Sequence, residues 1–210
     1  LVGETGAGKT SVTNVLNRFY DIQKGSINID THSIKDVKLN SLRKQIAFVQ
    51  QEVFLFSDSI FNNITLYDEH ISINKVEQAA KQIGIHDFIS TLPGGYNYSV
   101  GERGVTLSTG QRQLIAFLRV YVRNPKILIL DEATSSIDTE TEQLLQNALE
   151  KLAINRTLII IAHRLSTIRN ADKILLFQDG KIIEQGTHNY LMQKKGVYQR
   201  MYSTQQFINK

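Results

Sequence analysis

The sequence predicts an α/β fold in which a mostly parallel central sheet is flanked by helices. After residue 125, short apolar runs alternate with a helical pattern, in the order strand 126–130, helix 139–152 and strand 156–162. In addition, the glycine-rich opening segment runs directly into apolar residues at helical spacing. Strands that alternate with helices form parallel βαβ units, whose helices cover both faces of one sheet.

The first fifty residues show the same alternation in shorter pieces. A helix is expected from Lys9, because apolar side chains recur every three to four residues as far as Phe19. Beyond it, a strand, a helix and a second strand are expected in turn over residues 25–30, 37–45 and 46–50.

The middle of the chain reads as a helical subdomain at about 54–122, inserted into the α/β pattern. Its helices are expected over about 57–92 and, after a glycine-rich loop, over about 108–122. Near the C-terminal end, strand patterns flank Asp179-Gly180, and such a dipeptide predicts a β-hairpin. The remaining residues are expected to be helical.

Composition narrows the range of functions. The longest apolar run, residues 157–162, is far shorter than the ~18 residues that a membrane span needs. There is no cysteine, which excludes disulfides and thiolate catalysis. The net charge is +4, but Lys and Arg are scattered, so we expect a solvated surface and no nucleic-acid partner.

The first motif with a chemical reading is "GETGAGKT", which matches G-x-x-x-x-G-K-[ST]. Glycines let successive backbone N–H groups turn toward phosphate oxygens, and the following helix adds its positive N-terminal end. Lys9 is expected at the β- and γ-phosphates, and the Thr10 hydroxyl at Mg²⁺. The alternative is a glycine-rich turn without a ligand. The residues expected to bind the nucleotide here are Gly3, Glu4, Thr5, Gly6, Ala7, Gly8, Lys9, Thr10 and Ser11.

Four polar residues follow apolar strands, and ligands of open α/β sheets bind at the carboxyl ends of strands. Asp131 is expected to support Mg²⁺, together with Thr10 and the amide of Gln51. Glu132 is expected to orient or deprotonate an attacking water, and His163 to act as a further catalytic group. Taken singly, the acidic pair also fits a helix-capping turn, and the glutamine an ordinary loop.

The stretch "LSTGQ" lies at the start of a predicted helix. Ser108, Gly110 and Gln111 would form a second anion site there, although alone the stretch is also an ordinary N-cap. A chain with one complete phosphate loop needs no second γ-phosphate site for its own nucleotide. A dimer does need one, because each subunit can then close over the ATP of the other.

These stretches, in this order, resemble the nucleotide-binding domain of ATP-binding cassette (ABC) transporters, which are P-loop NTPases. The phosphate loop resembles Walker A, "ILILDE" Walker B, "LSTGQ" the signature, "SSID" the D-loop, and "AHRLST" the segment with the switch histidine. "SVGERG" and the C-terminal residues resemble the exporter branch. The resemblance covers residues 1–210.

Domains of this family carry strands before Walker A, and exporters carry a membrane domain before those strands. The chain is therefore expected to be the C-terminal piece of a longer protein.

The resemblance implies ATP hydrolysis with Mg²⁺ that powers export, at the cytoplasmic face of a membrane. Its implied partners are a second nucleotide-binding domain and the transmembrane domain of the same polypeptide, which residues 54–67 would contact unless their aromatics are core. The alternative is a soluble ABC-type ATPase that acts on DNA or ribosomes, but no coiled-coil insertion or tandem cassette is present.

Thr109 replaces the third-position glycine of the usual LSGGQ. Either this residue is tolerated, or the dimer is a heterodimer with one impaired site.

Overall fold

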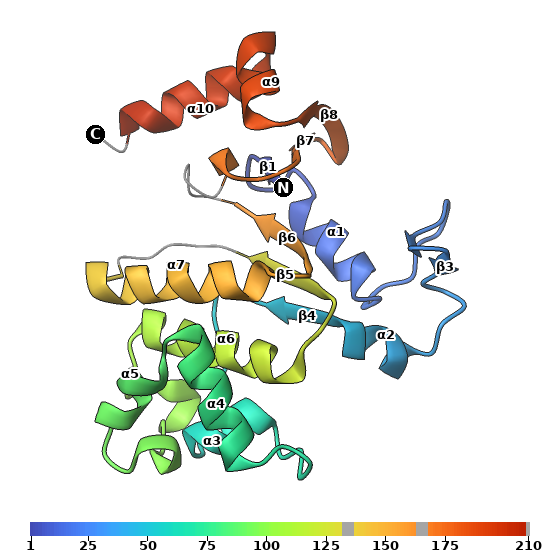
Figure 1. The fold of residues 1–210 in the computed structure, drawn as a ribbon. Helices are drawn as coiled ribbons and strands as arrows, with labels where there is room; N and C mark the ends of the chain where they lie inside the picture. Colours follow the sequence, from blue (N-terminus) through green and yellow to red (C-terminus); the bar gives the residue numbers. More distant parts are fainter. Residues whose placement is uncertain (132–136, 163–167, 209–210) are drawn as a thin grey trace. The chain divides into compact units, whose positions relative to one another are not determined.

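Figure 1 shows the computed structural model, which describes residues 1–131, 137–162 and 168–208 and, within these, the side chains up to Thr204. The chain divides into two compact units. The first comprises residues 1–43, 129–134 and 159–210, and the second comprises residues 44–128 and 135–158.

The first unit is organised around β1 (Val2–Gly3). Its neighbour β7 (Ile174–Gln178) runs parallel to it, with Val2 opposite Leu176 and Gly3 opposite Phe177. On its other side, the N–H of Ala162 donates a hydrogen bond of 3.0 Å to the carbonyl oxygen of Leu1. The phosphate loop therefore leaves a short strand that is hydrogen-bonded along both edges.

Helix α1 (Lys9–Leu16) follows the loop, as the sequence predicts, but ends three residues before Phe19. Arg18 has a positive φ of 50°, so the helix cannot continue through it. Phe19 lies outside the helix and is exposed, with the guanidinium of Arg43 5.3 Å from its ring centroid.

The remaining short elements of the N-terminal part follow in order. They are the antiparallel pair β2 (Asn28–Ile29) and β3 (His32–Ser33) and the helix α2 (Leu39–Gln45). The predicted strand in this region is thus one arm of a hairpin.

The C-terminal part of the first unit is a hairpin with two helices beside it (Figure 1). Strands β7 and β8 (Lys181–Gly186) pair antiparallel, which confirms the predicted hairpin. The helices are α9 (His188–Lys194) and α10 (Val197–Ile208). They close a core over β1 whose buried members are Val2, Ala162, Ile168, Ile174, Leu176, Leu191, Tyr198 and Tyr202.

A buried carboxylate anchors α10 to β8. The two oxygens of Glu184 accept hydrogen bonds of 3.0 Å from the N–H groups of Val197 and Tyr198. These donors lie in the first turn of a helix and therefore have no acceptor within it. The Glu184 side chain thus replaces a conventional N-cap for α10.

The second unit contains the predicted helical segment. Helix α6 (Thr109–Arg123) contacts α3 (Ile60–Thr65), α4 (Ile73–Ile83) and α7 (Thr139–Ala153), as Figure 1 shows. Shorter elements are α5 (His86–Thr91) and the 3₁₀ turns η1 (Gly95–Asn97) and η2 (Glu102–Gly104). The fully buried side chains at these contacts include Ile60, Ile64, Val76, Ile83 and Leu118.

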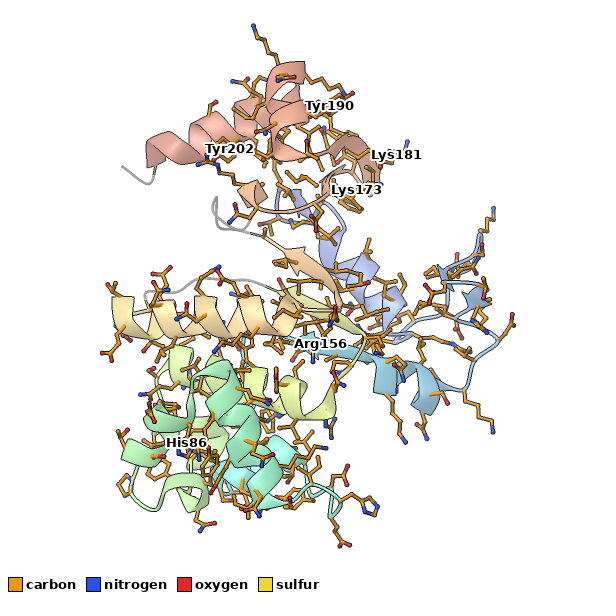
Figure 2. The ribbon with its side chains drawn as sticks, viewed as in Figure 1. His86, Arg156, Lys173, Lys181, Tyr190 and Tyr202 are labelled. Carbon is orange, nitrogen blue, oxygen red and sulfur yellow. The ribbon has the colours of Figure 1, made fainter. Side chains whose placement is uncertain are left out.

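A three-stranded sheet with the order β4-β5-β6 completes the fold. Its strands are β4 (Ile46–Val49), β5 (Ile127–Asp131) and β6 (Thr157–Ile161), all at predicted positions. Arg156, labelled in Figure 2, donates to the carbonyl oxygens of Pro125 (3.1 Å) and Leu152 (2.7 Å) and so ties the end of α7 to the entry of β5. Within the described ranges, no helix combines the length and apolar character of a membrane span.

Removing the buried cap of α10 should destabilise the protein. We expect Glu184→Ala to lower the free energy of unfolding by about 1–3 kcal/mol, because the buried N–H of Tyr198 and the partly buried N–H of Val197 lose their acceptors. Glu69→Ala, at an exposed position, is the control and should change stability by less than about 0.5 kcal/mol. Denaturant titration of both variants would measure this. Equal stability of the two variants would show that the carboxylate is not a cap.

Candidate functional site

The phosphate loop packs closely against β7 at its start. A Cβ atom on Gly3 would overlap the carbonyl oxygen of Phe177, so only glycine permits this approach of the two strands. Within the loop, the N–H of Ala7 donates a hydrogen bond of 3.2 Å to the carbonyl oxygen of Glu4. The chain therefore turns tightly between β1 and α1.

The Lys9 side chain is buried against the loop and hydrogen-bonded to its backbone. The residue is only 6% exposed, and its ammonium group donates to the carbonyl oxygens of Gly3 (2.7 Å) and Glu4 (2.8 Å). Burial lowers the pKa of Lys9, and the negative charge of Asp131 partly offsets this effect. The carboxylate of Asp131, at the end of β5, thus acts on the Lys9 ammonium through its negative charge.

Several other predicted residues of this segment are exposed, whereas Ala7 is buried. Glu4, Thr5, Gly6, Thr10 and Ser11 are exposed, and the last two occupy the first turn of α1. N–H groups in a first helical turn have no intrahelical acceptor, so they are available to an anion. A pocket of about 520 Å³ opens beside the loop, lined by Gly3–Ala7, Leu176–Asp179 and residues of β8 and α10.

A contact that sequence reasoning missed ties this loop to the β7–β8 hairpin. The N–H of Gly180, in the hairpin turn, donates a hydrogen bond of 3.1 Å to the carbonyl oxygen of Ala7. The sequence predicts the turn itself, but no local signal indicates what the turn touches.

Ser108 and Gln111 form a capping box at the start of α6. The Ser108 hydroxyl accepts from the N–H of Gln111 (3.2 Å), and the Gln111 side chain accepts from the N–H of Ser108 (3.0 Å). These two side chains therefore order the helix end. The N–H groups of Thr109 and Gly110 are the ones left without an intrahelical acceptor.

Gly110 has a packing role in addition. A Cβ atom at this position would overlap the side chain of Thr141 in α7 and lie 3.0 Å from Cγ2 of Ile137. The glycine therefore lets the first turn of α6 pack directly against the segment that begins α7. This segment is capped by Asp138, whose carboxylate accepts from the N–H of Thr141 at 2.8 Å.

Thr109 is part of a local hydrogen-bond network. Its hydroxyl accepts from the guanidinium of Arg112 at 3.1 Å. The same guanidinium donates to the carbonyl oxygens of Leu107 (2.7 Å) and Gly104 (3.3 Å). The side chain at the altered signature position is thus held toward its own helix and the preceding turn.

Three further residues are predicted to belong to the site. Gln51 is exposed and lies two residues beyond the end of β4. Glu132, which follows Asp131 directly, and His163, which follows β6 after Ala162, lie outside the described residues.

Comparison with known proteins identifies the family to which the chain belongs. Residues 1–135 match the family model described as ABC transporter. The chain belongs to the ABC transporter family.

Relatives and solved structures agree with this assignment. The chain is 50% identical over 204 residues to a protein of Staphylococcus aureus strain NCTC 8325 named as a multidrug export ATP-binding/permease protein. A protein of the same description from strain bovine RF122 is equally similar. The structure of a bacterial Atm1-family ABC exporter with ATP bound matches with a TM-score of 0.89 and 45% identity. Each match covers 97% of this chain but only 35% or 36% of the relative's length.

These likenesses confirm two of the sequence predictions. The fold is that of an ABC-type P-loop domain, with parallel strands and flanking helices. The domain is an ATP-binding domain of this family. The roles of individual site residues stay predictions.

Loss of the Lys9 charge should weaken ATP binding. We expect Lys9→Ala to reduce the affinity for ATP by at least about tenfold, since a charge-assisted contact with phosphate is lost. Lys9→Arg should restore affinity only in part, because the planar guanidinium differs in shape from the buried ammonium. Titration calorimetry would measure both, with the exposed Lys24→Ala as control. Unchanged affinity in both Lys9 variants would rule out this role.

Proposed function

We propose that this domain hydrolyses ATP with Mg²⁺ and thereby powers export across a membrane. The observation that carries the proposal is the buried Lys9 ammonium beside the Asp131 charge at the Walker A loop. The export direction rests on the relatives, whose names describe them as multidrug export proteins.

The Walker A loop would hold the phosphates. In the structure Lys9 donates to two carbonyl oxygens of the loop, so the ammonium is already placed at the loop's inner side. Phosphate oxygens would compete for the same donors, and the first-turn N–H groups near Thr10 and Ser11 would add further contacts. The chain thus binds and orients the triphosphate with a fixed charge and fixed dipoles.

The residues present fit a Mg²⁺ ion. This ion is usually bound through one or two carboxylates together with substrate phosphates and water, and not by a cage of protein ligands. Asp131, at the end of β5, is a carboxylate of this kind. Thr10 and Asp131, which both belong to the first unit, would hold the ion, which would neutralise charge on the β- and γ-phosphates.

Glu132 and His163 would supply the hydrolytic groups. Both follow strands, β5 and β6, whose carboxyl ends are where ligands bind in such sheets. Glu132 would orient or deprotonate the attacking water, and His163 would contact the γ-phosphate end of the site.

A second nucleotide-binding domain would complete the site. The start of α6, with Ser108, Gly110 and Gln111, would close over the ATP bound to the partner domain. The Arg112–Thr109 hydrogen bond supports a tolerated substitution in this segment, because it turns the extra side chain toward its own helix. We therefore favour a symmetric pair of domains over a heterodimer with an impaired site.

The helical segment would dock on the membrane domain through an exposed aromatic surface. Phe54 and Phe56 are 53% and 45% exposed and pack edge to face with ring centroids 5.2 Å apart. The fully buried Leu55 between them anchors the segment. The sequence left open whether these aromatics contact the membrane domain or belong to the core. Their exposure favours a docking surface.

Buried polar groups hold this surface rigidly. The Asn63 side chain accepts from the N–H of Phe56 (2.8 Å) and donates to its carbonyl oxygen (3.0 Å), as a paired strand would. Arg119 of the signature helix donates to the carbonyl oxygen of Asn63 at 2.8 Å. Burial lowers the pKa of Arg119 to about 10. A short hydrogen-bonded path therefore joins the signature helix to the proposed docking surface.

Glu132→Gln tests the hydrolytic role. The amide cannot accept a proton from water, so we expect turnover to fall at least about a hundredfold, the lower end of general-base effects. MgATP binding should persist, because the side chain is not assigned to binding. Steady-state ATPase and equilibrium binding of the intact transporter would separate the two. Near-normal turnover would exclude this glutamate as the base.

Photocrosslinking tests the docking surface. With p-benzoylphenylalanine at position 56 of the intact transporter, we expect crosslinks to a cytoplasmic loop of the membrane domain. The same probe at Tyr190, an aromatic of comparable exposure (56%) on α9 (Figure 2), is the control and should give none. Crosslinks confined to position 190, or absent at 56, would place the docking surface elsewhere.

A further inference from the structure

We propose that the turn of the β7–β8 hairpin is a positioning element for ATP binding, and that it acts through the backbone N–H of Gly180. The inference rests on ATP binding by the domain. It does not depend on hydrolysis or export, which are parts of the proposed function.

The turn contacts the Walker A loop at two consecutive residues. Gly180 N–H donates to the carbonyl oxygen of Ala7 at 3.1 Å. At the next residue, a Cβ atom built on Gly8 would lie 3.4 Å from the Cα of Gly180, which is van der Waals distance. The backbone of the turn therefore lies directly against the last peptide of the loop before α1.

This hydrogen bond sets the direction of a donor in the loop. In a trans peptide the C=O and the following N–H point in opposite directions, and none of the described peptide bonds is cis. Because the Ala7 carbonyl points at the turn, the N–H of Gly8 must point away from it. Gly8 is the N-cap of α1, so its N–H joins the helix-terminal donors expected to face the phosphates.

The position of the turn is determined by the strand that also positions the loop. Strand β7 pairs with β1 through Val2 and Gly3, and with β8 up to the pair Gln178–Lys181 that closes the hairpin. Figure 2 labels Lys181, the first residue after the turn. Strand β7 thus positions both ends of the Walker A loop. It positions the start by pairing with β1, and the end through the hairpin turn that follows β7.

The turn needs its present backbone conformation to make the contact. Asp179 and Gly180 have φ values of 49° and 73°, which suit a two-residue type I′ hairpin turn. A Cβ atom on Gly180 would meet no heavy atom within 4 Å. A Cβ atom at this position is therefore disfavoured by the positive φ and not by a clash.

This geometry allows a matched pair of substitutions. Gly180→Asn keeps the N–H and tolerates the left-handed conformation, whereas Gly180→Val keeps the N–H but disfavours that conformation. We expect Gly180→Val to lower the affinity for MgATP by about tenfold, the effect of losing one hydrogen bond to a charged group. Gly180→Asn should stay within about twofold of the unmodified protein.

A backbone ester isolates the N–H itself. Glycolic acid in place of Gly180, incorporated by cell-free translation, removes the donor and leaves the side-chain surface unchanged. The same replacement at Gly84, whose N–H donates to the carbonyl oxygen of Ala80 at 2.9 Å at the end of α4, controls for the loss of any backbone hydrogen bond. Both esters should lower thermal stability, but only the ester at position 180 should lower MgATP affinity by about tenfold.

Titration calorimetry on the full chain would measure the MgATP affinity of each variant, and thermal unfolding would check that each variant is folded. Normal affinity of the ester at position 180 would overturn the inference, and so would an equal loss in Gly180→Asn and Gly180→Val. Equal losses of affinity for the two esters would also overturn it, since the effect would then be general destabilisation. A loss confined to Gly180→Val and the ester at position 180 would support it.

Discussion

The interaction on which the site depends is the burial of one ammonium group inside a turn of backbone. The carbonyl oxygens of Gly3 and Glu4 accept hydrogen bonds from the Lys9 ammonium, and the negative charge of Asp131 stabilises it. A buried charge without such partners would be strongly unfavourable.

Residues far along the chain maintain this arrangement. The first two residues of the loop's strand are paired with β7, and the loop's last peptide is hydrogen-bonded to the turn that follows β7. Glu184 then anchors α10 beside the same hairpin. The C-terminal elements therefore support the N-terminal loop through backbone contacts.

The second unit uses buried polar groups for a different purpose. The Asn63 side chain hydrogen-bonds both backbone groups of Phe56, and Arg119 donates to the carbonyl oxygen of Asn63 in α3. Phe54 and Phe56 are exposed beside these contacts. At the other end of α6, the helix that contains Arg119, Gly110 permits close packing on α7. Both ends of α6 are thus positioned by contacts that tolerate little displacement.

Local patterns in the sequence were sufficient for the order of strands and helices, the hairpin turn at Asp179-Gly180 and the phosphate loop around Lys9, because spacing and turn chemistry act between near neighbours. They misplaced the end of the first helix near Phe19 and left the exposure of Phe54 open. The contact of Gly180 with the phosphate loop was not predictable, and neither was the packing role of Gly110. These features are set by residues distant in the sequence, which become neighbours only when the strands pair and the helices pack.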